Sequence, residues 1–259
     1  TIRGSGQGVD LVRIFNNSLV RIADCIIERG GQGMFVSNMC QVNVLRSTFQ
    51  DNVSNGIRVS ANSLLSLGTV SGDTVATVVQ RNGGHGVQVD ENAMAQIYGK
   101  TVLKDNGGAG LNLTGGRARL CCNEGQRQLL NNRAGIELTG GTVHIDGPAI
   151  IKDHVGGGIN AFGAAVAISG PVVIEGNKTF GILLLGSSAT IGQGQTIRSN
   201  GSGAMSHGGI AAARTSNLRL TSSQVVNNNG QGIYVGENSM AFLSGNTITG
   251  NSAEGVRVW

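Results

Sequence analysis

The residues of this chain that are best placed to do chemistry recur at fixed points of a repeating pattern. Asp90, Glu137 and His144 are the ionisable side chains with positions suited to catalysis. A pair of carboxyl groups can cleave a glycosidic bond, and histidine is the commonest general acid or base. Seven further side chains could bind a polar substrate, four on one surface and three on another: Gln88, Asn112, Asn160 and Phe162, then Gln96, Tyr98 and Arg119.

A series of marker glycines sets the positions of these residues. Successive markers are 23 to 30 residues apart. Repetition over such a period is typical of a solenoid, in which one structural unit is copied along an axis. The markers are Gly8, Gly33, Gly56, Gly86, Gly110, Gly135, Gly158, Gly181, Gly209, Gly232 and Gly255.

Each marker glycine opens a short segment that alternates apolar and variable residues, as in 86–89 and 232–235. This period of two predicts a strand with one buried face. A second alternating segment and a third buried position follow in each repeat. Glycine, at 43 of 259 residues, argues against a helical solenoid because each interior glycine costs a helix about 1 kcal/mol relative to alanine. The sequence therefore predicts an all-β parallel solenoid of about ten coils, with three short strands per coil.

Asparagine recurs four residues before most of the marker glycines. Asparagine tolerates a left-handed backbone and bonds neighbouring backbone groups at corners. Stacked copies can also bond one another as a ladder, and we favour this interpretation over an outward row that binds sugar. The predicted ladder consists of Asn52, Asn82, Asn106, Asn131, Asn177, Asn228 and Asn251.

The pattern N-x-x-x-G-[IV]-x-[VL], followed by alternating apolar residues and G-N-T-I, resembles the right-handed parallel β-helix repeat of the pectin-lyase-like superfamily. It is visible at 106–113, 228–235 and 245–248, and related patterns cover essentially the whole chain. The resemblance implies a right-handed parallel β-helix in an extracellular or cell-surface protein that binds or processes polysaccharide. The same scaffold carries lyases, epimerases and glycoside hydrolases, but also binding and purely structural proteins.

The catalytic motifs of that superfamily are incomplete in this chain. Gly84-His85-Gly86 matches the G-H-G motif of polygalacturonases, but neither D-D nor R-I-K occurs. His85 also fills the variable position before a marker glycine, so we favour a corner residue over a catalytic one. The sequence leaves three classes open: an enzyme (a polysaccharide lyase, epimerase or glycoside hydrolase), a polysaccharide-binding module, or a structural or adhesive stalk segment without activity.

The first candidate surface is formed by the residues two and four positions after each marker glycine. We expect these to form an outward polar stripe that ends in an aromatic ring. Asp90 and Glu137 lie two coils apart on it, about 10 Å by backbone spacing, which slightly exceeds the roughly 6.5–9.5 Å between the carboxyl groups of inverting glycosidases. The stripe comprises Gln88, Asp90, Asn112, Thr114, Glu137, Thr139, Asn160 and Phe162.

The second candidate surface lies on the next strand, where Gln96, Arg119 and His144 are expected to stack, with Tyr98 and Asp146 beside them. Longer corners at 69–77 and 122–128 flank it, and insertions in a solenoid often border the binding face. Arg119 could pair with a uronate carboxylate. His144 or Tyr98 could then act as base or acid.

Composition limits the kinds of partner that this chain is expected to bind. A net charge of +4 and a pI of about 9.1 fit an acidic polysaccharide, but no aromatic-rich basic patch indicates nucleic acid. No apolar run approaches the roughly 20 residues of a membrane-spanning helix, and no metal or other cofactor is expected. We expect residues 1–259 to form one β-helix domain that is part of a longer chain. Leu183, Leu185 and Phe242 are apolar positions through which copies of the chain could associate.

Overall fold

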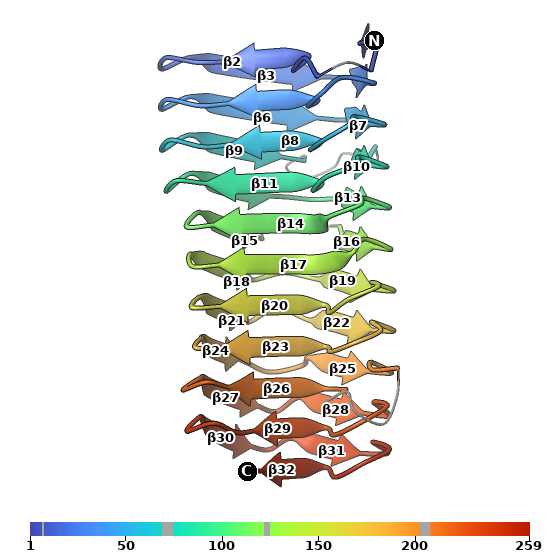
Figure 1. Ribbon diagram of the computed structural model, residues 1–259, viewed down its shortest axis with the longest axis vertical. Coiled ribbons are helices and arrows are strands. Elements are labelled where there is room, and N and C mark those ends of the chain that lie inside the picture. Colours follow the sequence, from blue (N-terminus) through green and yellow to red (C-terminus); the bar gives the residue numbers. More distant parts are fainter. Residues whose placement is uncertain (7, 69–74, 122–124, 203–207) are drawn as a thin grey trace.

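The computed structural model describes residues 1–6, 8–68, 75–121, 125–202 and 208–259. In it the chain winds into a parallel β-helix, with the two ends of the chain at opposite ends of a stack of coils (Figure 1). The described residues form 32 strands in three parallel sheets, and no helix. The predicted all-β solenoid with three strands per coil is therefore confirmed, with about eleven turns.

Each coil contributes one strand to each of the three sheets, which we call A, B and C. Sheet A contains β1 (Ile2–Arg3), β4 (Ile26–Glu28), β7 (Thr48–Gln50), β10 (Thr77–Gln80), β13 (Thr101–Lys104), β16 (Arg127–Leu130), β19 (Ala149–Lys152), β22 (Val172–Glu175), β25 (Thr196–Arg198), β28 (Gln224–Val226) and β31 (Thr247–Thr249). Sheet B contains β2 (Val12–Ile14), β5 (Met34–Val36), β8 (Ile57–Val59), β11 (Val87–Asp90), β14 (Ala109–Thr114), β17 (Ala134–Thr139), β20 (Ile159–Phe162), β23 (Ile182–Leu185), β26 (Ile210–Ala213), β29 (Ile233–Val235) and β32 (Val256–Val258). Sheet C contains β3 (Leu19–Ala23), β6 (Gln41–Leu45), β9 (Leu64–Leu67), β12 (Met94–Ile97), β15 (Arg117–Leu120), β18 (Thr142–Ile145), β21 (Ala165–Ile168), β24 (Ser188–Ile191), β27 (Asn217–Thr221) and β30 (Met240–Ser244).

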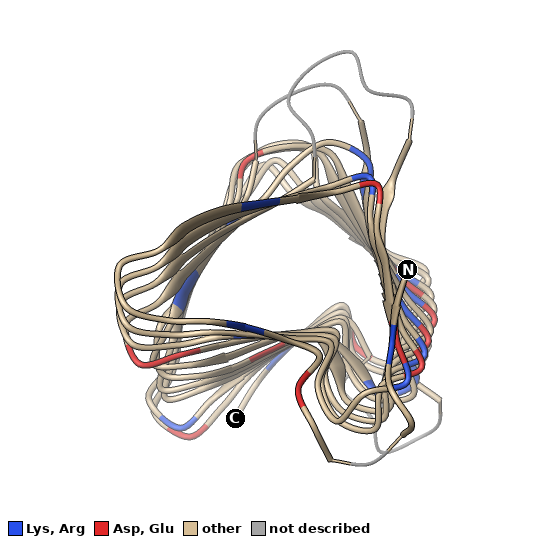
Figure 2. Cartoon of the chain, turned by 90° about the horizontal axis from the view of Figure 1, so that it is seen from above, with Lys and Arg blue, Asp and Glu red and all other residues tan. Residues whose placement is uncertain are grey.

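The core is a set of apolar columns that run along the axis. Ile136 pairs with Ile159, Ile159 with Ile182, and Ile182 with Ile210, and all four are completely buried. Because a side chain of this size contributes about 1.5–3 kcal/mol when buried, stacking stabilises coils that could not bury their apolar faces alone. Seen along the axis, successive coils superimpose closely (Figure 2).

Most of the marker glycines are required by the close stacking of the coils rather than by an unusual backbone. A Cβ on Gly86 would lie 2.6 Å from the carbonyl oxygen of Gly110, and one on Gly232 would lie 2.5 Å from that of Gly255. Real Cβ atoms do not approach a backbone oxygen so closely. Gly8 differs from these two, since its φ is +46° and a Cβ there would meet nothing.

The predicted asparagine ladder is present at the corner between sheets A and B, with one wrong member. The Oδ1 atom of Asn106 accepts hydrogen bonds from the backbone N–H (3.1 Å) and Nδ2 (3.0 Å) of Asn82 in the preceding coil. In the next coil the ladder position is held by Asn132, which is completely buried, and not by Asn131, which is exposed. The spacing rule failed because only three positions separate this ladder residue from its marker glycine, Gly135.

Two other ladder residues were not predicted. Asn200 belongs to the ladder, with its Oδ1 2.8 Å from the Nδ2 of Asn177. It escaped the spacing rule because nine positions separate it from Gly209. His154 replaces asparagine in one coil, where its Nδ1 accepts the backbone N–H of Asn132 at 3.0 Å.

Candidate functional site

The outer face of sheet B brings the predicted polar stripe together as two columns. Neighbours within a column are one coil apart, about 4.8 Å. The first column contains Phe35, Arg58, Gln88, Asn112, Glu137 and Asn160. The second contains Asp90, Thr114, Thr139 and Phe162.

Asp90 is not exposed as the stripe predicted. Only 5% of the residue is accessible, because neighbouring polar side chains cover its carboxylate. Oδ2 pairs with the Nε of Arg58 at 2.9 Å, and the Nε2 of Gln88 lies 3.0 and 3.1 Å from the two carboxylate oxygens. Both oxygens of Asp90 are thus engaged within the protein.

The two carboxylates of the stripe also lie in different columns. Glu137 is aligned with Gln88 and Asn112, whereas Asp90 is aligned with Thr114. Two coils along the axis and two residues along the strand put their Cα atoms about 12 Å apart. The expected spacing of about 10 Å counted only the coils, so it was too short. The catalytic assignment of Asp90 and Glu137 remains a prediction.

His85 lies at this surface, half-buried, in the coil of Gln88 and Asp90. Its Nδ1 accepts the backbone N–H of Ala109 at 2.9 Å, and its Nε2 is 3.3 Å from the side-chain nitrogen of Asn112. Burial lowers the pKa of the imidazole, and Arg133 lowers it further, against the opposing effect of Glu137 and Asp90. A neutral ring that accepts at Nδ1 carries its proton on Nε2. The Nε2 of His85 and the amide nitrogen of Asn112 are then both donors, so their approach is a contact and not a hydrogen bond.

Asn55 joins the same network, although the sequence did not single it out. Its Nδ2 donates to the Oε1 of Gln88 at 2.6 Å, and its Oδ1 accepts the backbone N–H of His85 at 2.8 Å. Asn55 and His85 both directly precede a marker glycine, Gly56 and Gly86. The residue directly before the marker glycine is therefore the sequence signal for this network. Its type varies from coil to coil, so the sequence predicts only a corner there.

The accessible part of the surface lies further along the axis. Thr114 and Thr139 are exposed, and Glu137, Asn160 and Phe162 are half-buried. Beyond Phe162 the outer face becomes apolar.

Leu183 and Leu185 belong to this apolar stretch. They are half-buried, because they pack with Phe180 against a small outer cluster of Ala211, Ala213 and Tyr234. Association of copies through Leu183, Leu185 and Phe242 remains a prediction.

Sheet C brings the second predicted surface together. Gln96, Arg119 and His144 stack in register, as expected. Two of the members have intramolecular partners, since the hydroxyl of Tyr98 donates to Gln96 and the Nε of Arg119 lies 2.5 Å from the Oδ2 of Asp146. Burial opposes ionisation of Asp146, but hydrogen bonds from Arg119 and Ser169 outweigh it and lower the pKa of the carboxyl. In the flanking corners, 69–74 and 122–124 are outside the described residues.

A comparison with family models agrees with this geometry. The model of the right-handed β-helix region matches residues 123–259, more than half of the chain. The chain belongs to the right-handed β-helix family. No curated protein and no solved structure matches it.

In the part of the chain that the structure describes, no group of three or more His, Cys, Asp or Glu side chains is arranged to hold a metal ion. Nor does any helix among the described residues have the length and apolarity to cross a membrane.

Proposed function

We propose that this β-helix is an extracellular polysaccharide-binding domain and that the outer face of sheet B is its binding surface. The observation that carries the proposal is the register of the two columns on that face. Amide, carboxylate and hydroxyl groups repeat along the axis from Gln88 to Asn160, and the aromatic ring of Phe162 follows them.

This arrangement suits a long polar polymer that lies along the axis. The hydroxyl groups of a sugar chain recur along its length, as do the side chains of a column, spaced about 4.8 Å apart. Parallel strands hold the columns rigidly, so little conformational freedom is lost on binding. Phe162 supplies an apolar face on which a sugar ring can stack, as expected where an aromatic ring meets a polar surface.

The geometry favours binding over turnover. The carboxylate of Asp90 is held by Arg58 and Gln88, and the Nδ1 of His85 is held by the backbone of Ala109. Asp90 and Glu137 also stand in different columns of sheet B.

A structural stalk is the second candidate. It is favoured by the regularity of the described coils, in which every strand pairs with its copy in the next coil. An enzyme or binding domain usually departs from local regularity at its site, whereas the strands of sheet B keep their register from coil to coil.

A polysaccharide panel separates these candidates. Neutral and acidic polysaccharides are tested for binding by affinity electrophoresis, and the same mixtures are assayed for reducing and unsaturated ends. We expect binding without turnover, weakened by Asn112→Ala and by Phe162→Ala. Gln224→Ala is the matched control, because Gln224 is an exposed amide on sheet A.

Each other outcome contradicts the proposal in a specific way. If no polysaccharide binds, the stalk is the better account. If Asn112→Ala and Phe162→Ala bind as the unaltered protein does, sheet B is not the binding surface. Release of unsaturated or reducing ends that Glu137→Gln abolishes would establish an enzyme.

A further inference from the structure

Several asparagines of this chain are followed directly by glycine. At such a pair the backbone nitrogen of the glycine, unhindered by a side chain, can attack the Cγ atom of the asparagine and convert its amide to a carboxyl group. The two groups must be able to approach each other, so the fold decides which pairs can react. The pairs are Asn55-Gly56, Asn82-Gly83, Asn106-Gly107, Asn200-Gly201 and Asn229-Gly230.

The asparagine ladder holds the amides of three of these pairs. Asn82, Asn106 and Asn200 are buried. The Oδ1 of Asn200 accepts hydrogen bonds from the backbone N–H (3.1 Å) and the Nδ2 (2.8 Å) of Asn177, and its Nδ2 donates to the carbonyl oxygen of Ile174 at 3.1 Å. The amides of Asn82 and Asn106 are bonded in the same pattern. None of the three can turn toward the following nitrogen without breaking the ladder.

The glycine nitrogens of the same three pairs are also engaged. Gly83, Gly107 and Gly201 each donate the backbone N–H to the carbonyl oxygen of the ladder residue one coil earlier, at 2.8–2.9 Å. The nitrogen must lose its proton before it attacks, and a hydrogen-bonded backbone amide does so only when the structure around it opens. Both partners of the reaction are therefore held apart in these pairs.

Asn55 is held by the polar surface of sheet B instead. Its Nδ2 donates to the Oε1 of Gln88 at 2.6 Å, and its Oδ1 accepts the backbone N–H of His85 at 2.8 Å. The N–H of Gly56 donates to the carbonyl oxygen of His85 at 3.0 Å. This fourth pair is thus protected as well.

Asn229-Gly230, at the corner between β28 and β29, differs in both respects. Asn229 directly follows the ladder residue Asn228, but its own side chain is exposed, and its Oδ1 accepts a hydrogen bond at 3.1 Å from the hydroxyl of Ser252, which is also exposed. Among the described residues, nothing accepts the N–H of Gly230. The fold leaves this amide in contact with water and this nitrogen able to lose its proton.

We propose that Asn229 is a site of spontaneous deamidation in the folded protein, and that the other four pairs are protected from it. The nitrogen of Gly230 gives its proton to hydroxide and forms a bond to the Cγ of Asn229. The Cγ–Nδ2 bond breaks, and the amide nitrogen takes a proton from water and leaves as ammonia. Water then opens the cyclic imide at one of its two carbonyl groups, which leaves aspartate or isoaspartate.

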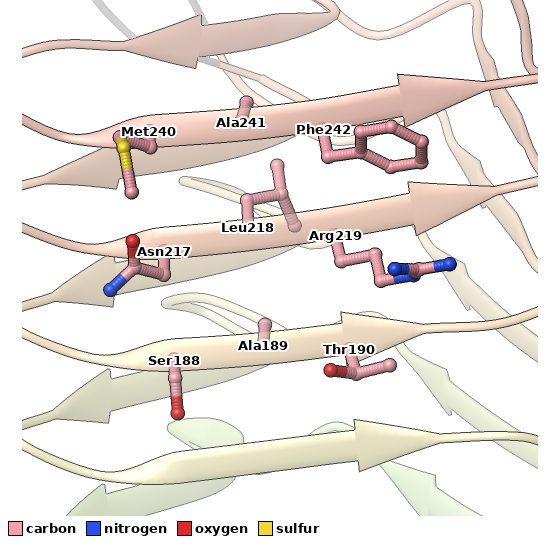
Figure 3. Close-up of a pocket in the computed structure, with 9 residues that line it drawn as sticks. All are labelled: Ser188, Ala189, Thr190, Asn217, Leu218, Arg219, Met240, Ala241 and Phe242. Atoms are coloured by element: carbon pink, nitrogen blue, oxygen red, sulfur yellow. The ribbon is translucent and has the colours of Figure 1, made fainter.

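The modification changes a coil as well as a charge. Either product adds a negative charge at the corner, and isoaspartate also adds one atom to the backbone. Asn229 lies in the coil that joins β27 to β30, and these strands carry Arg219 and Phe242 side by side in a hollow of about 440 Å³ on sheet C (Figure 3). The corner lies apart from the polar columns of sheet B, so the proposal does not depend on the proposed function.

Peptide mapping of aged protein tests the proposal. The folded chain, and the chain unfolded in urea, are incubated at mildly alkaline pH in water enriched in heavy oxygen, which labels each new carboxyl group. Trypsin separates the pairs, since each falls in a different peptide: 47–58, 82–100, 105–117, 199–214 and 220–257. Fragmentation of peptide 220–257 then distinguishes Asn229 from the other asparagines in it.

We expect all the pairs to convert at similar rates in urea. In the folded chain, Asn229 should convert within about tenfold of its rate in urea, since an exposed corner opens at little cost. The other four asparagines should convert about a thousandfold more slowly or less, because they react only when the β-helix opens. Asn229→Gln should remove the label from this position, because the longer side chain closes the ring far less readily.

The proposal is overturned if Asn229 keeps its amide in the folded chain, or if it does not convert in urea. It is also overturned if any of the other four pairs converts as fast as Asn229 in the folded chain, because the ladder and the contacts of Asn55 would then give no protection. Equal labelling of peptide 220–257 in Asn229→Gln and in the unaltered protein would place the reaction at another residue.

Discussion

The histidine in the asparagine ladder should make this β-helix less stable in mild acid. His154 is completely buried. The ring Nδ1 of His154 accepts the backbone N–H of Asn132 at 3.0 Å, and the backbone N–H of His154 donates to the Oδ1 of Asn177 at 3.2 Å. The ring Nε2 has no hydrogen-bond partner. Burial lowers the pKa of His154 from 6.5 to about 4, against smaller opposing effects of the backbone of Asn132 and Leu129 and of the neighbouring carboxylate of Asp153.

The size of the effect follows from the difference between the folded and unfolded pKa values. The unfolded chain takes up a proton on His154 as the pH falls through 6.5, whereas the folded chain does so only near 4. Between these values the unfolded state binds more protons, so acid lowers the free energy of unfolding. At about 1.4 kcal/mol per pKa unit, the full loss is roughly 3 kcal/mol, most of it between pH 6.5 and 4.

His154→Asn should abolish this loss. Its neighbours Asn132 and Asn177 donate Nδ2 to the carbonyl oxygens of Leu103 and Ile151 in the preceding coils. An asparagine at position 154 has the equivalent carbonyl of Leu129 available. It would restore the ladder and add about 1 kcal/mol at neutral pH, the net value of a typical hydrogen bond.

Urea unfolding followed by far-ultraviolet circular dichroism, at several pH values from 7.5 to 4, measures the comparison. The other ionisable groups are common to both proteins, so the difference between the two curves isolates His154. We expect the advantage of His154→Asn to grow by roughly 3 kcal/mol across this range. Parallel pH profiles would refute the argument, because they would show that His154 takes up its proton equally well in the folded and unfolded chain.

Three other substitutions test the architecture, each by thermal or urea unfolding. Asp90→Asn removes the partner of Arg58 beneath the polar surface and should cost about 1–3 kcal/mol; an unchanged midpoint would show that the pair is not formed. Gly86→Ala puts a Cβ 2.6 Å from the Gly110 oxygen and should lower the free energy of unfolding by about 1–3 kcal/mol. Gly255→Ala should lower it much less, because the Cβ there meets nothing nearer than 3.5 Å. Equal costs would contradict the stacking account of the marker glycines. Asn132→Ala should lower the free energy of unfolding by at least about 2 kcal/mol, because it leaves buried backbone groups unpaired. Asn131→Gly, at an exposed position with a left-handed backbone (φ 52°), should change it by no more than about 0.5 kcal/mol. The reverse order would show that Asn131 belongs to the ladder.

Most of the architecture could be predicted because the repeat is local and periodic. Alternation after each marker glycine identified the strands of sheet B, and the stacking of Gln96, Arg119 and His144 followed from counting along each coil. The counting failed where the coil length changes. Asn132 and Asn200 were missed because the number of residues between the ladder and the marker glycine differs in those two coils.

The candidate sites were less predictable, since they depend on contacts between coils. The sequence placed Asp90 on the outer face but could not show that Arg58 and Gln88 cover it. It gave His85 a corner position but not its contact with Asn112. The hollow beside Arg219 and Phe242 was not anticipated, although Phe242 had been noted as an exposed apolar residue.

By itself, the sequence determined the all-β solenoid, the three strands per coil and the side of each strand that faces the core. It could do so because a period of two and a repeat of fixed chemistry are properties of neighbouring residues along the chain. Only the tertiary structure decided which side chains meet across coils and which of their charges remain unpaired. Residues such as Arg58 and Asp90 are more than thirty positions apart in the chain, and the register between coils, set by backbone stacking and by the exact length of each corner, brings them into contact.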